Sequence, residues 1–208
     1  MKILVFGATG KLVVQQALEN AFEVTAFVRD PSKIMTHHNL KIVQGNVMIP
    51  ATIDAVILGH DAVICCLGLP ATKPGLLRSQ GTQNIINSMR KFDISRFFCQ
   101  TSLGYADSEK LLANTPFVFR KLIVPLLLKK TFEEHALQEN IIKQTDLDWT
   151  IARPGSMTNG KLTGNYKWGF SSDDTSVKVK ISRADTAHFM VQQLYSNSNV
   201  RKAVGISY

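Results

Sequence analysis

The sequence has few of the residues that hold metal centres or small secreted domains together. Three cysteines occur among 208 residues, and Cys65, Cys66 and Cys99 all fall inside apolar, strand-like runs. They offer neither a metal-ligand spacing nor an even disulfide framework. No histidine–carboxylate spacing suggests a metal site either. We expect three small buried thiols in a reducing cytoplasm, and no metal.

Long apolar runs are equally scarce. The segment Phe117–Leu128 is too short for a membrane span, carries Arg120 and Lys121, and contains Pro125. It predicts a lid or docking helix beside a substrate pocket, with a peripheral membrane contact as the less favoured alternative. No signal-peptide pattern precedes the first apolar run, so we expect neither secretion nor an integral membrane segment.

Acidic residues are outnumbered by basic ones. The chain has 16 Asp and Glu against 24 Lys and Arg, a formal net charge of +8. A nucleic-acid surface would cluster these cations with aromatic residues, whereas here they are scattered. We therefore expect no nucleic-acid partner, and a basic surface that attracts an anionic cofactor and substrate.

The most informative motif lies at the start of the chain. An apolar run ends in a Gly-x-x-Gly turn, Gly7 to Gly10, and a helical pattern follows. Free N–H groups and the positive end of a helix dipole make such a turn an anion site. We expect Gly7, Thr9, Gly10 and Lys11 to hold a pyrophosphate, although an ordinary strand–turn–helix is the alternative. Val13 stands where the dinucleotide fingerprint has its third glycine.

Short apolar runs alternate with amphipathic stretches through the first two-thirds of the chain. The predicted strands are Lys2–Phe6, Glu23–Val28, Leu40–Gln44, Asp61–Leu67, Arg96–Gln100 and Asp148–Ala152. The predicted helices are Lys11–Asn20, Pro50–Leu58, Leu76–Lys91 and Thr131–Gln144. The alternation predicts one Rossmann-like α/β domain over 1–208, a doubly wound parallel sheet with helices on both faces. Its ligand crevice would lie at the carboxyl ends of the strands. Substrate-side elements are expected mainly in 103–130 and 153–180.

Residues just after the early strands are candidates for cofactor binding. Arg29 follows the second strand, where an arginine accommodates the 2′-phosphate of NADP; Asp30 leaves room for NAD. Asn46 follows the third strand and could touch the adenine edge. Leu67 and Gly68 follow the fourth, where small residues let the backbone pass close to the cofactor. NADP, as NADPH, is the expected cofactor.

Residues after the fifth and sixth strands point to the reacting end of the cofactor. Thr101 and Ser102 follow the fifth strand, and a Ser102 hydroxyl there could hydrogen-bond a substrate, although serine also favours caps and turns. Pro154 turns the chain across the cleft. The expected substrate-side residues are Tyr105, His135 and Ser156. An exposed helical histidine is, however, more often inert.

The last third predicts one further pair of elements. Residues 162–166 have the pattern of an extended segment on the substrate side. A strand then runs into a helix capped by Ser182, with Asp185 as its structural capping partner.

Taken in order, these motifs resemble those of a known family. The stretches are Gly7-Ala8-Thr9-Gly10, Val28-Arg29-Asp30, Asp61-Ala62-Val63-Ile64, Gly81-Thr82-Gln83-Asn84, Thr101-Ser102, Arg153-Pro154-Gly155, Leu162-Thr163-Gly164-Asn165-Tyr166 and Ile181-Ser182-Arg183-Ala184-Asp185. The chain resembles the atypical short-chain dehydrogenase/reductases, in the small NAD(P)H-binding branch of the biliverdin-IXβ reductases, also called flavin reductases. The resemblance implies NADPH binding, hydride transfer to flavins (FMN or FAD) or linear tetrapyrroles, and Ser102 as the active-site serine.

Two departures from that family pattern bear on function. The usual acid after the third strand is Asn46 here, and none of the four tyrosines has a lysine four residues later. A Tyr-x-x-x-Lys pair makes a phenol able to exchange a proton, so we do not expect redox chemistry at a carbonyl or alcohol through a tyrosine.

The function that follows is an NADPH-dependent reductase acting on a small, planar, conjugated acceptor, as a monomer or weak homodimer. A catalytically silent NADPH sensor that binds a protein partner is the alternative, since it too would lack the tyrosine. An epimerase or dehydratase is less favoured, because those reactions usually need the tyrosine base.

Overall fold

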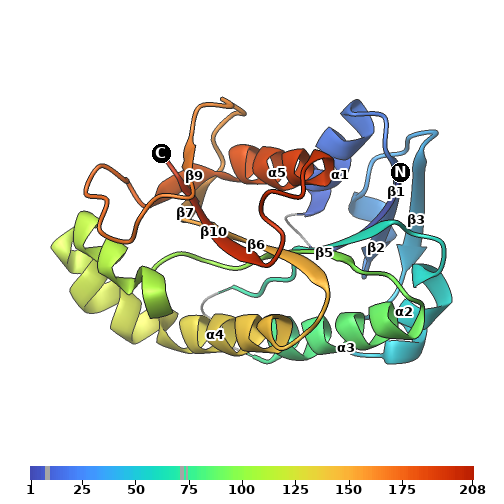
Figure 1. The fold of residues 1–208 in the computed structure, drawn as a ribbon, viewed down its shortest axis with the longest axis horizontal. Coiled ribbons are helices and arrows are strands. Elements are labelled where there is room, and N and C mark those ends of the chain that lie inside the picture. The colour runs from blue at the N-terminus through green and yellow to red at the C-terminus, as the bar shows by residue number, and fades with distance from the viewer. Residues whose placement is uncertain (8–9, 71–72, 74) are drawn as a thin grey trace.

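A central sheet organises the residues that the computed structural model describes, which are 1–7, 10–70, 73 and 75–208. Within them, eight strands hydrogen-bond in the order β3-β2-β1-β4-β5-β6-β10-β8 (Figure 1). The strands are β1 (Lys2–Phe6), β2 (Glu23–Val28), β3 (Leu40–Gln44), β4 (Ala62–Cys65), β5 (Arg96–Gln100), β6 (Asp148–Pro154), β8 (Lys167–Trp168) and β10 (Lys202–Ser207). All neighbours run parallel except β8, which is antiparallel to β10. A second, small sheet pairs β7 (Ser156–Thr158) with β9 (Lys180–Ser182).

Helices cover both faces of the central sheet. On one face α1 (Gly10–Glu19) packs beside α5 (Arg183–Gln192). On the other lie α2 (Pro50–Ile57), α3 (Leu77–Lys91) and α4 (Lys129–Lys143), as Figure 1 shows. The predicted doubly wound α/β fold is therefore confirmed.

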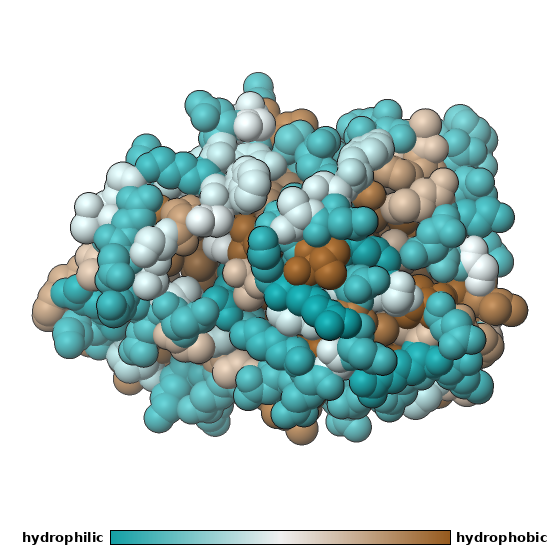
Figure 2. All heavy atoms as spheres, viewed as in Figure 1, coloured by the Kyte–Doolittle hydropathy of each residue, from teal (hydrophilic) through white to brown (hydrophobic). Residues whose placement is uncertain are grey.

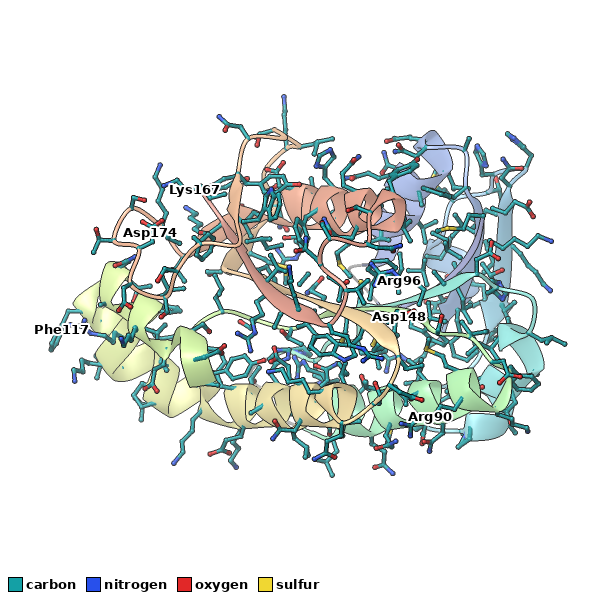
Figure 3. All side chains as sticks on the ribbon, viewed as in Figure 1. Arg90, Arg96, Phe117, Asp148, Lys167 and Asp174 are labelled. Atoms are coloured by element: carbon teal, nitrogen blue, oxygen red, sulfur yellow. The ribbon has the colours of Figure 1, made fainter. Side chains whose placement is uncertain are left out.

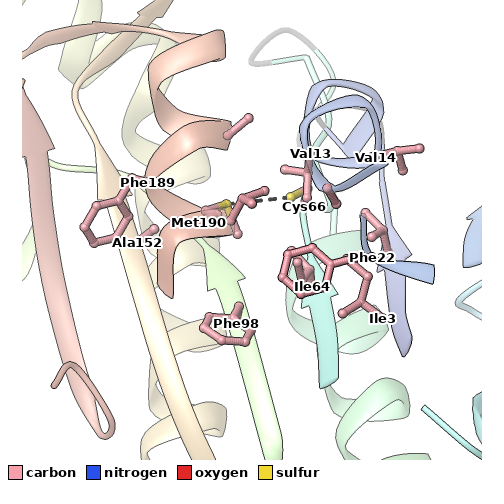
Figure 4. Packing of buried hydrophobic residues seen from close by; sticks show 14 of the residues in the cluster. Ile3, Val13, Val14, Phe22, Ile64, Cys66, Phe98, Ala152, Phe189 and Met190 are labelled. Carbon is pink, nitrogen blue, oxygen red and sulfur yellow. Dashed lines mark hydrogen bonds between the residues drawn. The ribbon is translucent and has the colours of Figure 1, made fainter. Parts of the chain in front are cut away.

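The alternation of side chains along β1 explains why the central strands are apolar throughout. Ile3 and Val5 belong to the core under α1 and α5, whereas Leu4 and Phe6 belong to the core under α2 and α3. Figure 4 shows the first of these cores, where Cys66 lies against Met190. A strand buried on both faces needs an apolar residue at every position, which gives the continuous runs seen in the sequence.

The predicted elements agree with the structure to within two residues at each end. The largest differences are two residues, as in the fourth strand, which ends at Cys65 rather than at the predicted Leu67. The sequence analysis did not predict β10, which extends the sheet beyond β6.

A helical extension leaves the carboxyl end of β5 and returns to the sheet through α4. It consists of a 3-10 segment, η2 (Ala106–Asn114), and a π-helix, η3 (Phe119–Leu128), that continues directly into α4. In Figure 1 these segments form the end of the molecule opposite β3. Across the described ranges, the structure contains no helix whose length and apolarity would let it cross a bilayer.

Asp185 ties the chain after β7 to the start of α5. Ser182 caps that helix by accepting a hydrogen bond from the Asp185 N–H at 2.9 Å, as predicted. The Asp185 carboxylate accepts from the N–H groups of Thr163 and Gly164 at 2.9 and 2.8 Å. Burial opposes ionisation of Asp185, but these bonds and one from the Tyr208 hydroxyl outweigh it and lower its pKa to about 2. The expected structural role of Asp185 is confirmed.

Candidate functional site

Two cavities open at the carboxyl ends of the parallel strands. The first, which we call the glycine-turn cavity, has a volume of about 630 Å³ and lies beside β1, β2 and the residues after β3 and β4. The second, the Ser102 cavity, has a volume of about 640 Å³ and lies beside the ends of β5 and β6. Leu67 and Gly68 line both cavities, so the two meet there. This is the edge at which a doubly wound sheet binds its ligands.

The backbone of the turn after β1 approaches its neighbours too closely for a side chain. Gly7 has a φ of +99°, and a Cβ on it would lie 2.1 Å from the carbonyl oxygen of Cys66. The Gly10 N–H donates to the Gly7 carbonyl at 3.1 Å, and α1 begins at Gly10. The positive end of the α1 dipole therefore faces the turn, as expected for an anion site. Thr9, also expected here, lies outside the described residues.

Two cations stand on the wall of the glycine-turn cavity. Lys11 lies in the first turn of α1 and Arg29 directly after β2, and both are exposed. The neighbouring Asp30 carboxylate accepts hydrogen bonds from the N–H and hydroxyl of Ser32 at 3.2 and 2.7 Å, and so caps the short helix η1 (Pro31–Lys33). A cavity with these two cations and a helix N-terminus suits a ligand carrying several phosphates.

Asn46 lies beside this cavity rather than on its wall. The neighbouring Gly45 and Val47 line the cavity, whereas the Asn46 side-chain oxygen accepts a hydrogen bond from the Met48 N–H at 3.0 Å. That bond shapes the turn after β3. The expected contact of Asn46 with adenine stays a prediction.

The Ser102 cavity gathers most of the residues expected at the reacting end. Five more of the predicted site residues share its wall with Leu67 and Gly68: Thr101, Ser102, His135, Pro154 and Ser156. The η3 helix closes one side with Phe119, Ile123 and Leu128, as a lid would. Tyr105 is not among the described residues on this wall, and neither is the extended segment 162–166.

Tyr105 instead takes part in a buried network centred on Glu139. One Glu139 oxygen accepts from the hydroxyls of Thr101 and Tyr105 at 2.8 and 2.6 Å, and from Arg153 Nε at 2.8 Å. Burial opposes ionisation of Glu139, but the Arg153 hydrogen bonds and charge lower its pKa to about 2. Burial and the negative charge of Glu139 together raise the pKa of Tyr105. The phenol is thus a fixed donor within this network.

His135 faces the Ser102 cavity as a buried, neutral imidazole, not as an exposed one. Burial, with the positive charge of Arg78, lowers its pKa to about 4. Its Nδ1 lies 3.2 Å from Gln138 Oε1, while Gln138 Nε2 donates to Thr82 and Cys99. Since the Gln138 oxygen can only accept, the imidazole proton lies on Nδ1. The other nitrogen, Nε2, is left as a hydrogen-bond acceptor.

A buried ion pair fixes the segment that joins the two cavities. Arg78 Nη1 donates to Glu134 at 2.6 Å, and Arg78 Nη2 donates to the Leu69 carbonyl at 2.8 Å. Glu134 also accepts from the Arg78 backbone N–H at 2.7 Å, in the first turn of α3. It therefore takes the place of the side-chain cap that the residue before α3 lacks.

Gln100 lines the Ser102 cavity and carries an unsatisfied, buried acceptor. Its side chain is buried and its Oε1 makes no hydrogen bond within the described structure, while Nε2 lies 3.6 Å from the Met157 sulfur. A half-buried arginine, Arg183, lines the same cavity, and no aspartate or glutamate does so in the described part of the chain. The wall therefore offers an acceptor at His135 Nε2 and a positive charge at Arg183. A ligand with hydrogen-bond donors and an acidic group matches it.

Comparison with known proteins identifies the family. Residues 6–197 match the NAD(P)H-binding family, so this chain belongs to it. A chloroplastic protein of Arabidopsis thaliana is 32% identical over 225 aligned residues, which cover 99% of this chain and 76% of that protein.

Solved structures share the fold at lower identity. A short-chain dehydrogenase/reductase from Veillonella parvula, solved in complex with NADP, is 15% identical with a TM-score of 0.79, covering 100% of this chain and 94% of that one. ChuY of Escherichia coli, described as an anaerobillin reductase, is 19% identical with a TM-score of 0.77, covering 100% and 97%. These likenesses show a Rossmann-like fold, and membership of the NAD(P)H-binding family agrees with it.

Proposed function

We propose that this protein is an NADPH-dependent reductase that delivers a hydride to a planar conjugated acceptor, a flavin or a biliverdin-like tetrapyrrole. The observation that carries the proposal is the pair of cavities that meet at Leu67 and Gly68. One has the glycine turn and the cations that a dinucleotide needs. The other has an apolar wall around Ser102, where an acceptor could lie.

The residues of the glycine-turn cavity fit a dinucleotide phosphate. The backbone between Gly7 and Gly10 and the α1 N-terminus would hold the pyrophosphate. Arg29 would bind the 2′-phosphate through its guanidinium, with Lys11 adding positive charge. A Cβ on Gly68 would meet no atom within 4 Å, so this glycine leaves open space where the cofactor would pass between the cavities. Bound NADPH supplies the hydride; the chain supplies position and charge.

The Ser102 cavity suits an acceptor that needs no proton from a tyrosine. Tyr105 is bound to Glu139 with a raised pKa, and His135 is neutral at physiological pH, so both are poor proton donors. A flavin or a bilin can take its proton from solvent or be protonated beforehand. Ser102 would orient the acceptor, while His135 Nε2 would accept a hydrogen bond from one of its N–H groups. The three cysteines are free, buried thiols, which suits a reducing cytoplasm.

Steady-state NADPH oxidation with FMN, FAD and biliverdin tests the proposal. We expect turnover with at least one acceptor. Ser102→Ala should lower kcat about 10-fold or more and leave the Kd for NADPH unchanged, because the hydroxyl acts on the acceptor alone. Ser95→Ala is the matched control, since exposed Ser95 precedes β5 as Ser102 follows it.

Three outcomes separate the alternatives. NADPH binding without turnover of any acceptor would favour the silent sensor instead. Equal kcat for Ser102→Ala and the wild type would remove the role of the serine. Absence of NADPH binding would overturn both the reductase and the sensor.

A further inference from the structure

The η3 helix and the residues next to it carry an exposed face with several large apolar side chains. Along the helix from residue 117 through η3 to 130, exposed positions recur about once per turn, at 117–118, 121–122, 125–127 and 129–130. They form one stripe, here called the outer stripe. Its large apolar side chains include Phe117, Leu122 and Leu126, which are 67%, 51% and 76% exposed. Figure 3 shows Phe117 at the end of the molecule opposite β3. In Figure 2 hydrophobic atoms lie between hydrophilic ones at this end.

Positive charge dominates the same stretch, and the exposed Glu133 that follows it makes no ion pair within the described residues. Four cations occur between residues 111 and 132, Arg120, Lys121, Lys129 and Lys130, and that stretch has no Asp or Glu. The three lysines are exposed and belong to the outer stripe. Across the described residues, none of the four cations forms an ion pair. Isolated apolar residues on a surface need no explanation, but an apolar row set among unpaired cations marks an interaction site.

We propose that the outer stripe docks on an anionic membrane surface. The apolar side chains would enter the boundary between lipid headgroups and acyl chains, and the lysines would lie among the lipid phosphates. Charge selects this occupant over a second copy of the chain, because two outer stripes face to face would bring cations against cations. The contact is peripheral, as a stripe along one helix face lies in the interface without crossing it.

The inner face of the same helix would link docking on a membrane to the Ser102 cavity. Phe119, Ile123 and Leu128 line the Ser102 cavity from the other side of η3. A docked η3 would therefore hold the lid of this cavity against the lipid surface. The docking itself does not rest on the proposed reductase activity, so the two fail or succeed separately.

Co-sedimentation of the full chain with lipid vesicles tests the docking. We expect binding to phosphatidylcholine vesicles that contain phosphatidylglycerol, weaker binding to phosphatidylcholine alone, and loss of the difference at high salt. Leu122→Ser with Leu126→Ser should lower the partition coefficient about 10-fold or more. Lys129→Glu with Lys130→Glu should lower it at least as much, since each lysine strengthens binding about 5-fold.

Matched variants elsewhere control for general changes in polarity and charge. Leu58→Ser alters a leucine that is 70% exposed at the end of α2, and Lys41→Glu with Lys161→Glu reverses two exposed charges away from η3. These variants should bind the anionic vesicles more tightly than their outer-stripe counterparts. Thermal unfolding of each variant checks that it folds. Vesicle binding that the outer-stripe variants leave unchanged would overturn the proposal. The proposal would also be overturned if the wild-type chain did not bind vesicles and instead formed dimers through the outer stripe, as measured by analytical ultracentrifugation.

Discussion

Glu139 on α4 and Arg153 at the end of β6 form a two-point ion pair in the interior. Arg153 Nε donates to one carboxylate oxygen at 2.8 Å, and Nη2 donates to the other at 2.5 Å. Both side chains are at most 4% exposed. Because Thr101 donates to the same carboxylate, the pair joins α4 to the ends of β5 and β6. It thereby positions the backbone from which Ser102 faces its cavity.

Breaking this pair should destabilise the fold. In Glu139→Gln, Arg153 keeps its buried charge without its main partner, so we expect the free energy of unfolding to fall by about 3 kcal/mol or more. Urea unfolding monitored by circular dichroism measures the change. Asp107→Asn is the control, because Asp107 also accepts from Arg153, at 2.6 Å, but is 74% exposed. That variant should lose less than about 1 kcal/mol. Equal losses in the two variants would contradict the argument.

His135 should make stability depend on pH in a defined window. Its pKa is about 4 in the fold, against an ordinary value of 6.5. Between these values the unfolded chain binds a proton that the folded chain does not, so the free energy of unfolding falls as pH falls from 6.5 to 4. The expected contribution is about 3 kcal/mol over the whole window.

The part of the pH dependence of stability that comes from His135 can be obtained by comparing the wild type with a variant that lacks the imidazole. The pH dependence of unfolding of the wild type minus that of His135→Gln should show a loss confined to this window. His38→Gln, which changes an exposed histidine, is the matched substitution for comparison. If the free energy of unfolding of His135→Gln varied with pH as that of the wild type does, a buried, neutral imidazole at residue 135 would be ruled out.

The parts of the site that sequence patterns predict are those encoded locally. The glycine turn, Arg29 and Ser102 each directly follow an apolar run, so the strand pattern places them at one sheet edge. The lid is also encoded locally, because η3 coincides with the apolar segment Phe117–Leu128 that the sequence analysis named as a lid or docking helix. The outer stripe needed the helix geometry, because a four-residue repeat of exposure is not visible without it.

The parts that sequence patterns miss depend on pairing between distant segments. Glu139 lies 14 residues from Arg153 and Glu134 lies 56 from Arg78, and in each pair the two residues belong to different elements, so no periodicity within one element relates them. No local pattern distinguishes these glutamates from solvated ones on the same helix. The orphaned oxygen of Gln100 is likewise visible only once the end of β5 meets Met157. Arg153 did give one signal, as an arginine before a Pro-Gly pair at the end of an apolar strand.

Enlarging residue 68 should separate the two cavities. Gly68 lines both, and a side chain there would project into open space, so the fold should tolerate it. We expect Gly68→Ala to weaken NADPH binding modestly and Gly68→Val to weaken it about 10-fold or more, because the larger side chain fills the junction. Isothermal titration calorimetry gives the affinities, and thermal unfolding confirms that both variants fold. A Gly68→Val protein that binds NADPH as the wild type does would place the cofactor elsewhere.

Arg29 should decide between the two nicotinamide dinucleotides. NADPH differs from NADH by the 2′-phosphate, so only NADPH gains from a guanidinium beside the ribose. Arg29→Gln should raise the Kd for NADPH about 10- to 100-fold and leave that for NADH nearly unchanged, the range expected for losing hydrogen bonds between charged groups. Arg90→Gln, which alters an exposed arginine near the end of α3, controls for the loss of one positive charge. If Arg29→Gln weakened both nucleotides equally, the arginine would be attracting phosphates in general. If it weakened neither, the 2′-phosphate would lie away from the end of β2, and the preference for NADPH would need another source.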